Sequence, residues 1–317
     1  TAITLGTGLA GREGPITPWG YLAAVAVGVL LQGLVAHCVN EIADWRSGTD
    51  GDPAPRAISG GSKVVASGLL TTRELAWLGL GAAVAATALG LAAAATWGWS
   101  LALFGIAGLA GAVLYTLPPL RAAYRPFVGE AVAFSCVWGC VAGGYLLQRG
   151  SLSGAAALAG VAHAASCVAM LMMHHYLDRG PDSRARPPKT TSVVLLGAAA
   201  RRYAVGWAAL ALAAALALTL AVDRRFAIAS VALALALAAH LRAVPDDPAS
   251  VTRSELAVIL LGMAAGLGTA AALHPPLAWA LLPPALLIPL EMRIAGTAHR
   301  ALFEERARLG RLEPEHL

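Results

Sequence analysis

The sequence predicts an all-α polytopic membrane protein, a bundle of about nine transmembrane helices, and three observations support this fold class. Hydrophobic residues make up 58% of the chain and charged residues only 13%, whereas a soluble domain carries about 25% charged residues. The apolar residues are gathered in runs of about 20, the length that crosses the hydrocarbon core of a bilayer. Runs of this length exclude a β-barrel, so helices must satisfy the backbone in lipid.

The predicted spans follow one another along the chain, separated by short Gly, Pro or charged breaks such as Pro118–Pro119. Residues 1–10 are apolar but short, so we expect them to be the end of a first span that begins before Thr1. The further spans are predicted at 17–39, 74–96, 98–117, 127–148, 153–177, 202–222, 225–243, 255–273 and 276–291. Together they form a single predicted domain, 1–317, with a polar C-terminal tail at 293–317.

Lys and Arg residues fall mainly on one side of the predicted spans. Thirteen of them lie in four loops on this side, at 40–73, 118–126, 178–201 and 242–253. The opposite loops carry only Arg12, Arg149, Arg224 and Arg225. Because basic loops stay in the cytoplasm, we expect a multi-pass protein of the cell membrane whose basic loops and C-terminal tail face the cytoplasm. The basic residues behind the net charge of +5 lie in loops between apolar runs, which is typical of the cytoplasmic face of a membrane protein. Binding to nucleic acid is therefore not expected.

The first long loop on the basic side begins with a run of acidic and amide residues. Asn40 and Asp44 lie four positions apart at the end of a predicted span, so their side chains share one helix face. Asp50 follows after a turn at Gly48, and Asp52 stands just beyond it. The end of this span therefore delivers several oxygen ligands to one face of the membrane.

The second long loop on the same side begins with a similar group. His174 and Asp178 share a helix face, and Asp182 lies four residues further on. Cations follow closely, namely Arg184, Arg186 and Lys189. Two spans that are far apart in the sequence thus bring carboxylates and basic side chains to the same membrane face.

Two groups of carboxylates that face each other need positive charge between them. Oxygen ligands suit Mg²⁺, which in proteins combines one or two carboxylates with the phosphate oxygens of a substrate. Nearby Arg and Lys side chains can hold further phosphate oxygens. Either segment alone would be typical of a solvated helix end, but the pair indicates a functional site because ionisable groups near a bilayer are costly. The expected ligand is a diphosphate bridged by Mg²⁺.

These segments resemble the motifs of the UbiA superfamily of intramembrane prenyltransferases. The stretch from Asn40 to Asp50 looks like the first Asp-rich motif, written NDxxDxxxD, and Asp178 to Asp182 with Lys189 and Thr191 is similar to the second. The spacing is closest to the 1,4-dihydroxy-2-naphthoate prenyltransferases of the menaquinone pathway. The third cytoplasmic loop of that branch is matched by Tyr115–Leu120, Tyr124 and Gly129–Glu130.

The resemblance implies an all-α bundle around a central cavity, in which Mg²⁺ bridges a prenyl diphosphate to the two motifs. The implied metal ligands are Asn40, Asp44, Asp50, Asp178 and Asp182. The implied substrate-binding residues are Asn40, Arg46, Tyr115, Arg121, Tyr124, His175 and Lys189. The implied catalytic residues are Asp44, Asp178 and Lys189. The prenyl group would pass to an aromatic acceptor, either naphthoate-like or quinone-like or another electron-rich ring, and membrane lipid would surround the bundle.

Departures from the branch pattern lie close to the expected pocket and leave the reaction open. Glu41 stands where an Asp is usual, and His174–His175 replaces a common pair of Asn. Glu130 is either a base near the acceptor or a charge at a helix N-terminus. The same superfamily includes terpene cyclases, in which the substrate's own double bonds capture the cation, and a lipid transporter is a further alternative. Aromatic residues amount to only 6% of the chain, which favours transfer, although one span expected to face inward carries Phe134, Trp138 and Tyr145.

Overall fold

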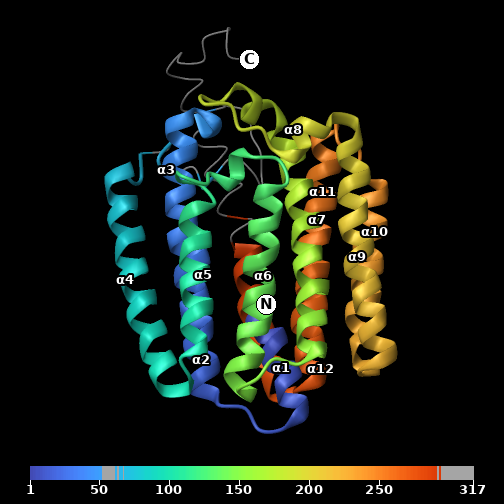
Figure 1. Cartoon of the computed structure of the whole chain (residues 1–317). Helices are drawn as coiled ribbons and strands as arrows, with labels where there is room; N and C mark the ends of the chain where they lie inside the picture. The colour runs from blue at the N-terminus through green and yellow to red at the C-terminus, as the bar shows by residue number, and fades with distance from the viewer. Residues whose placement is uncertain (52–60, 63, 67, 291–292, 294–317) are drawn as a thin grey trace.

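The computed structural model describes residues 1–51, 61–62, 64–66, 68–290 and 293, and these residues form a bundle of helices without any β-strand (Figure 1). Within this described part, seven helices are long and apolar enough to cross a membrane: Pro18–Ser47, Thr72–Trp97, Val128–Arg149, Gly154–Arg184, Ser192–Ala221, Arg224–Arg242 and Pro248–Leu273. Two shorter apolar helices are Ser100–Leu114 and Pro275–Leu290. The all-α membrane fold is therefore confirmed. The count of nine spans and the single domain stay predictions, and the tail, apart from Arg293, lies outside the described residues.

The first Asp-rich motif lies at the end of a long compound helix. The N-terminal helices are α1 (Ala2–Glu13), α2 (Pro18–Gly28), a π-helical stretch (Val29–Ala36) and α3 (His37–Ser47). Pro18 suits the first turn of α2, because an N–H at that position would have no partner within the helix. α3 ends at Ser47 and is followed by Gly48, whose φ of 83° is left-handed and is readily adopted by glycine. The chain therefore leaves the helix one turn after Asp44.

Two further helices precede the loop that covers the acidic end of the bundle. They are α4 (Thr72–Trp97) and α5 (Ser100–Leu114). α4 begins with a capping box, in which the Thr71 side chain accepts from the N–H of Glu74 and the Glu74 side chain accepts from the N–H of Thr71. α5 is shorter than the span predicted at 98–117. Pro118 accounts for this end, because proline has no N–H to donate and its ring would clash with the helical carbonyl four residues earlier, that of Leu114.

The second Asp-rich motif is helical, which corrects the prediction of a loop from residue 178 onward. α6 (Val128–Arg149) leads into α7 (Gly154–Arg184), which continues well past the predicted end at residue 177. Asp178 and Asp182 therefore stand on the last turns of α7, one turn apart on the same face. α7 contains Pro181 and ends in Arg184, a cation that suits the C-terminal end of the helix dipole.

The remaining helices complete the bundle. They are α8 (Ser192–Leu196), α9 (Ala200–Ala221), α10 (Ala227–Arg242), α11 (Pro248–Met263) and α12 (Thr269–Leu273). Thr191 caps α8, since its side chain accepts from the N–H of Val194. A π-helical stretch, Ala264–Gly268, separates α11 from α12. This second irregular stretch, like the one before α3, lies in the middle of an apolar helix.

α1 packs within the bundle against α6, α7 and α12. Small residues allow its backbone to approach the neighbouring helices closely. A Cβ added to Gly6 would overlap the carbonyl of Val141, and one added to Gly144 would overlap the backbone of Ile3. Such contacts are typical of helices packed in membranes, where small residues replace the hydrophobic effect as the means of association. Residues 1–10, predicted to be helical, are thus a packed part of the bundle.

Both Asp-rich motifs lie at the same end of the bundle (Figure 1). α3 ends near the top of the figure, and α7 reaches the same end before the chain enters α8, whereas α1 and α12 lie toward the opposite end. A backbone hydrogen bond joins the two motifs, since the N–H of Arg186 donates to the carbonyl of Ser47 at 2.9 Å. The fold therefore brings together the two segments that the sequence places far apart.

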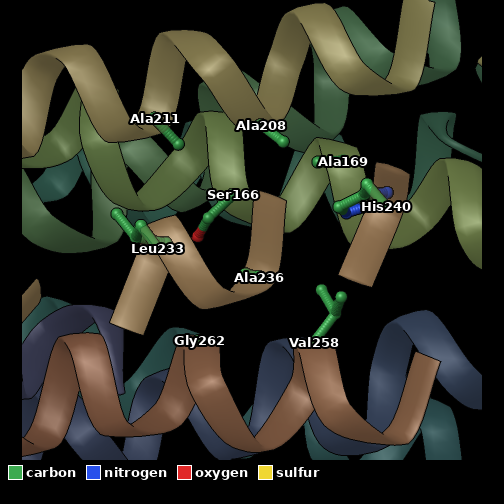
Figure 2. A pocket seen from close by; sticks show the side chains of 9 residues that line it. All are labelled: Ser166, Ala169, Ala208, Ala211, Leu233, Ala236, His240, Val258 and Gly262. Atoms are coloured by element: carbon green, nitrogen blue, oxygen red, sulfur yellow. The ribbon is translucent and has the colours of Figure 1, made fainter. Parts of the chain in front are cut away.

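A small cavity lies among α7, α9, α10 and α11 (Figure 2). Its walls are mainly Ala, Leu, Val and Gly, and it has room for about one water molecule. The buried ring of His240 stands at one end of it, and its Nε2 has no hydrogen-bond partner among the described residues. The cavity contacts α7 at Ser166 and Ala169, well before the acidic end of that helix. The central cavity that the resemblance implies is a different feature and stays a prediction.

Candidate functional site

Lys189 lies between the two Asp-rich motifs. Its Nζ is 3.1 Å from Oδ2 of Asp44 on α3 and 3.8 Å from Oδ1 of Asp182 on α7. All three side chains are buried. Burial alone would lower the pKa of Lys189, but the carboxylates of Asp44 and Asp182 outweigh it and hold that pKa above its usual value. The ammonium group therefore supplies the positive charge that these facing carboxylates need.

The loop after α7 folds back to place Lys189. Its N–H donates to the carbonyl of Asp182 at 2.9 Å, and the N–H of Arg186 is held by Ser47. Beyond Lys189, the hydroxyl of Ser192 accepts from the N–H of Phe127 at 2.7 Å and so ties α8 to the loop at 115–127. These hydrogen bonds fix the chain on both sides of Lys189.

Asp44 is held by polar side chains on both carboxylate oxygens. Asn40 donates its amide N–H to Oδ2 at 3.1 Å, and Tyr124 directs its hydroxyl at Oδ1 over 3.5 Å. The Ser47 hydroxyl donates to the backbone carbonyl of Asp44. The four-residue spacing predicted that Asn40 and Asp44 share a face, and the structure brings them into direct contact.

The carboxylates of Asp50 and Glu41 both lie close to Gly61. A Cβ added to Gly61 would overlap Oδ2 of Asp50 and would lie 3.0 Å from Oε2 of Glu41. The same Glu41 oxygen accepts from the N–H of Ser62 at 2.9 Å. Glu41 therefore adds an oxygen donor beside Asp50 that the predicted ligand set did not include. Asp52, which follows it in the sequence, lies outside the described residues.

The loop at 115–127 contributes two tyrosines to the site. Burial raises the pKa of Tyr115 to about 12, and the carboxylates of Glu130, Asp44 and Asp182 act in the same direction. Tyr115 is therefore a neutral hydroxyl donor at physiological pH. The Tyr124 ring lies 5.9 Å from Nζ of Lys189 and 5.9 Å from Cζ of Arg121, within the range of cation–π attraction.

Two cations predicted to bind substrate take different positions. Arg121 is exposed but stays at the site through its contact with the Tyr124 ring. Arg46 is exposed on α3 and lies two residues after Asp44, about 200° further around the helix. Its side chain therefore leaves α3 on the face away from Asp44.

The histidine pair on α7 divides between two environments. His175 is buried, and its Nδ1 has no hydrogen-bond partner among the described residues. His174 contacts two carboxylates: its Nε2 lies 3.3 Å from Oδ2 of Asp178 and its Nδ1 lies 2.8 Å from Oε1 of Glu255 on α11. Glu255 was missed by the sequence analysis. Its carboxylate inside an apolar span was a usable signal, because such groups are functional by default.

A further buried carboxylate lies behind the tyrosines. Glu130, in the first turn of α6, is only 2% exposed, and its Oε1 has no hydrogen-bond partner among the described residues. It is close enough to interact electrostatically with both Tyr115 and Tyr203. Tyr203 belongs to a run of ring contacts in which neighbouring centroids are 5.5–6.1 Å apart, formed by Phe127, Tyr203, Trp207 and Phe134.

Of the three aromatic residues expected to face inward from α6, only Phe134 belongs to this run. Trp138 donates its Nε1–H to the carbonyl of Ala157 on α7 and packs against Gly160. Tyr145 donates to the carboxylate of Glu13 near the opposite end of the bundle. α7 and α1 therefore take up the polar groups of these two side chains.

The donor groups fit a divalent cation that a substrate also binds. Among the described residues, no group of three or more His, Cys, Asp and Glu side chains is arranged to hold a metal ion alone. Mg²⁺, however, needs only one or two carboxylates when phosphate and water complete its six ligands. Glu41 with Asp50 forms one such pair, and Asp44 faces Asp182 across Lys189. The site therefore fits Mg²⁺ bound jointly with a phosphate ligand.

Comparisons with known proteins identify the fold and the family of the chain. The fold is similar to that of a UbiA homolog from Archaeoglobus fulgidus bound to DMAPP and Mg²⁺, with a TM-score of 0.58 at 13% identity over 86% of this chain and 94% of that chain. The same homolog bound to GPP and Mg²⁺ gives a TM-score of 0.55 at 14% identity over 86% and 96%. No match was found among curated proteins. The model of the UbiA prenyltransferase family matches residues 1–257, and the chain belongs to this family.

Proposed function

We propose that the protein is a Mg²⁺-dependent intramembrane prenyltransferase that moves a prenyl group from a prenyl diphosphate to an electron-rich aromatic acceptor. One observation carries the proposal: Lys189 lies buried between Asp44 and Asp182, which come from different helices at one end of a membrane bundle. Such an arrangement of facing carboxylates and a cation suits a polyanion held together with Mg²⁺. The fold shared with a homolog that binds DMAPP and GPP with Mg²⁺ supports the same assignment.

The proposed metal ligands are Asn40, Asp44, Asp50, Asp178 and Asp182, with Glu41 added from its position beside Asp50. When bound, Mg²⁺ would neutralise charge on the diphosphate and stabilise it as the leaving group. Lys189 would contact the diphosphate directly, and its buried ammonium would act more strongly there than in water. Asp44, Asp178 and Lys189 are thus the proposed catalytic residues.

The loop at 115–127 would close over the diphosphate. Tyr115 and Tyr124 would donate hydroxyl hydrogen bonds to phosphate oxygens, since the raised pKa of each phenol keeps it protonated. Arg121 would add charge from the exposed side. His175 would contact substrate only from its buried position on α7, and Arg46 would act at long range because its side chain leaves the far face of α3.

The acceptor would bind beside Glu130 and the run of aromatic rings. As the allylic C–O bond of the donor breaks, the ring carbon of the acceptor forms the new C–C bond and must then lose its proton. Glu130 is buried and its Oε1 has no hydrogen-bond partner among the described residues, so we propose that this carboxylate accepts that proton. The apolar helices around it would exclude water, which otherwise captures the allylic cation. A naphthoate-like or quinone-like ring is the proposed acceptor class.

A second candidate function, terpene cyclisation, is favoured by the same aromatic run. Rings placed 5.5–6.1 Å apart from Phe127 to Phe134 could stabilise a migrating cation, at about 0.5–2 kcal/mol per contact. Cyclisation to a hydrocarbon also ends with loss of a proton, so Glu130 does not separate the two reactions, but aromatic residues amount to only 6% of the chain, which favours transfer. We therefore place transfer first.

The decisive experiment supplies the purified protein and Mg²⁺ with prenyl diphosphates of several chain lengths, with and without a panel of aromatic acceptors. A prenylated aromatic product that requires the acceptor supports transfer. Cyclic hydrocarbon or terpene alcohol formed at enzymatic rates without acceptor, and lost in Asp44→Asn, would establish cyclisation instead. Uptake of intact prenyl diphosphate into vesicles without bond cleavage would identify a lipid transporter.

A further inference from the structure

Glu255 is a buried carboxylate that the proposed reaction does not use. It lies on α11, its residue exposure is 0%, and its Oε1 is 2.8 Å from Nδ1 of His174 on α7. Burying a carboxylate is costly unless it is well partnered, and the cost is greater inside a membrane protein. An apolar residue would fill the same space between α7 and α11 without that cost. The carboxylate at this position therefore calls for a role beyond packing.

The His174 ring connects Glu255 to the second Asp-rich motif. While Nδ1 faces Glu255, Nε2 lies 3.3 Å from Oδ2 of Asp178, one turn further along α7. Each ring nitrogen therefore faces one carboxylate, and a ring N–H can donate to either of them. Because both ring nitrogens are engaged on opposite sides, the plane of the imidazole is fixed between two helices. Oδ2 of Asp178 in turn lies against that ring.

We propose that Glu255 is a positioning residue that acts through His174 to orient the carboxylate of Asp178 toward the bound metal. The inference rests on the proposed function, in which Asp178 is a ligand of Mg²⁺. Carboxylates that bind metals are commonly held by such partners, and their loss typically costs about 10–100-fold in metal affinity. The interaction also joins α11 to the site, although α11 carries none of the predicted ligands.

The test measures metal binding without turnover. Purified protein in detergent is titrated with Mg²⁺ at a fixed concentration of inorganic pyrophosphate, and the midpoint of the resulting thermal stabilisation is recorded. Glu255→Leu should raise the Mg²⁺ midpoint about tenfold or more. Glu255→Gln should stay close to wild type, because its amide oxygen still accepts from His174. His174→Ala removes the ring that lies between the two carboxylates and should raise the midpoint as Glu255→Leu does.

A matched control separates positioning from packing. Val258→Ala creates a small defect in the same helix, at a buried residue one turn from Glu255, and should lower the unfolding temperature without moving the Mg²⁺ midpoint. If Glu255→Leu and His174→Ala behave like this control, Glu255 is structural only and the inference is overturned. If wild-type protein itself shows no Mg²⁺-dependent stabilisation with pyrophosphate, the proposed function fails first, and the two failures are thereby distinguished.

Discussion

Asp44 and Lys189 are 145 positions apart in the chain, and their side chains form a buried ion pair with 3.1 Å between Oδ2 and Nζ. This pair joins the end of α3 to the loop after α7. It closes the acidic end of the bundle through a single cation shared with Asp182. The arrangement gives Lys189 two tasks, since it holds the two motifs together and offers positive charge to an anionic ligand.

Replacing Lys189 should destabilise the protein. Lys189→Met leaves Asp44 and Asp182 buried without their shared cation, which typically costs about 3–5 kcal/mol. The pKa of Lys189 is raised in the folded state, so its contribution is fully present below the unfolded pKa of about 10.4 and is lost as the pH rises through the folded value. The difference in the free energy of unfolding between variant and wild type, measured in detergent, should therefore be the same at about pH 7 and pH 9. This difference should shrink only when the pH rises above the unfolded pKa.

Arg253→Met serves as the control for this measurement. Arg253 is an exposed cation on α11, so its loss should change the free energy of unfolding by less than about 1 kcal/mol. Equal and small effects of both variants would show that the ion pair of Lys189 contributes nothing to the fold.

Removal of divalent metal should stop turnover. Without Mg²⁺, the carboxylates of the two motifs would repel a diphosphate that carries the same sign of charge. Product formation from a prenyl diphosphate should therefore cease in excess EDTA and return when Mg²⁺ or Mn²⁺ is added back. Full activity in chelator, with metal absent by elemental analysis, would contradict the assignment of both motifs as metal ligands.

Single substitutions in each motif should abolish activity without unfolding the protein. Asp44→Asn and Asp178→Asn keep the side-chain volume but remove the charge that would bind metal, so turnover should fall by about 100-fold or more. Asp246→Asn is a matched control, because Asp246 is also a carboxylate at this end of the bundle but its side chain is 89% exposed. If a variant at Asp44 or Asp178 retains most of the wild-type rate, the carboxylate at that position is only a solvated charge at a helix end and not a metal ligand.

Sequence reasoning identified the carboxylates near the ends of two spans, because a spacing of four residues places side chains on one helix face whatever the tertiary structure. The same rule placed Asn40 and Asp44 on one face, where the structure brings them into contact. It could also have placed Arg46 away from Asp44, since their separation of two residues puts them on opposite faces. Periodicity therefore accounts for the part of the site that each helix builds alone.

Contacts between helices were beyond the reach of the sequence. The pairing of His174 with Glu255 depends on how α7 and α11 pack, and no spacing within one segment encodes it. The continuation of α7 through Pro181 was likewise missed, because a proline is normally evidence for the end of a helix. The segment predicted to be a loop is helical, and its helical geometry sets the directions of the Asp178 and Asp182 side chains.

The orientation of the protein in the membrane can be tested at Ser183. This residue is exposed at the end of α7, beside the second motif, and we predict from the distribution of Lys and Arg that it faces the cytoplasm. Ser183→Cys in intact cells should react with a membrane-impermeant maleimide only after the membrane is opened. The native cysteines lie within helices, so the unmodified protein provides the background. If intact cells are labelled from outside, the end of the bundle that carries the two motifs faces away from the cytoplasm, opposite to the prediction.

The last prediction concerns Glu130 and separates a base from a charge at a helix N-terminus. Glu130→Gln preserves the shape of the side chain but cannot accept a proton, so the rate of aromatic prenylation should fall by about 10²–10⁴-fold. Binding of the prenyl diphosphate should be unchanged, as measured by how far this ligand raises the unfolding temperature of the protein. Glu74→Gln is the matched control, because Glu74 is an exposed carboxylate in the first turn of α4 and its replacement should affect only stability, and only slightly. If Glu130→Gln prenylates as fast as Glu74→Gln, the carboxylate on α6 is a helix-end charge, and the proton must leave the acceptor by another route.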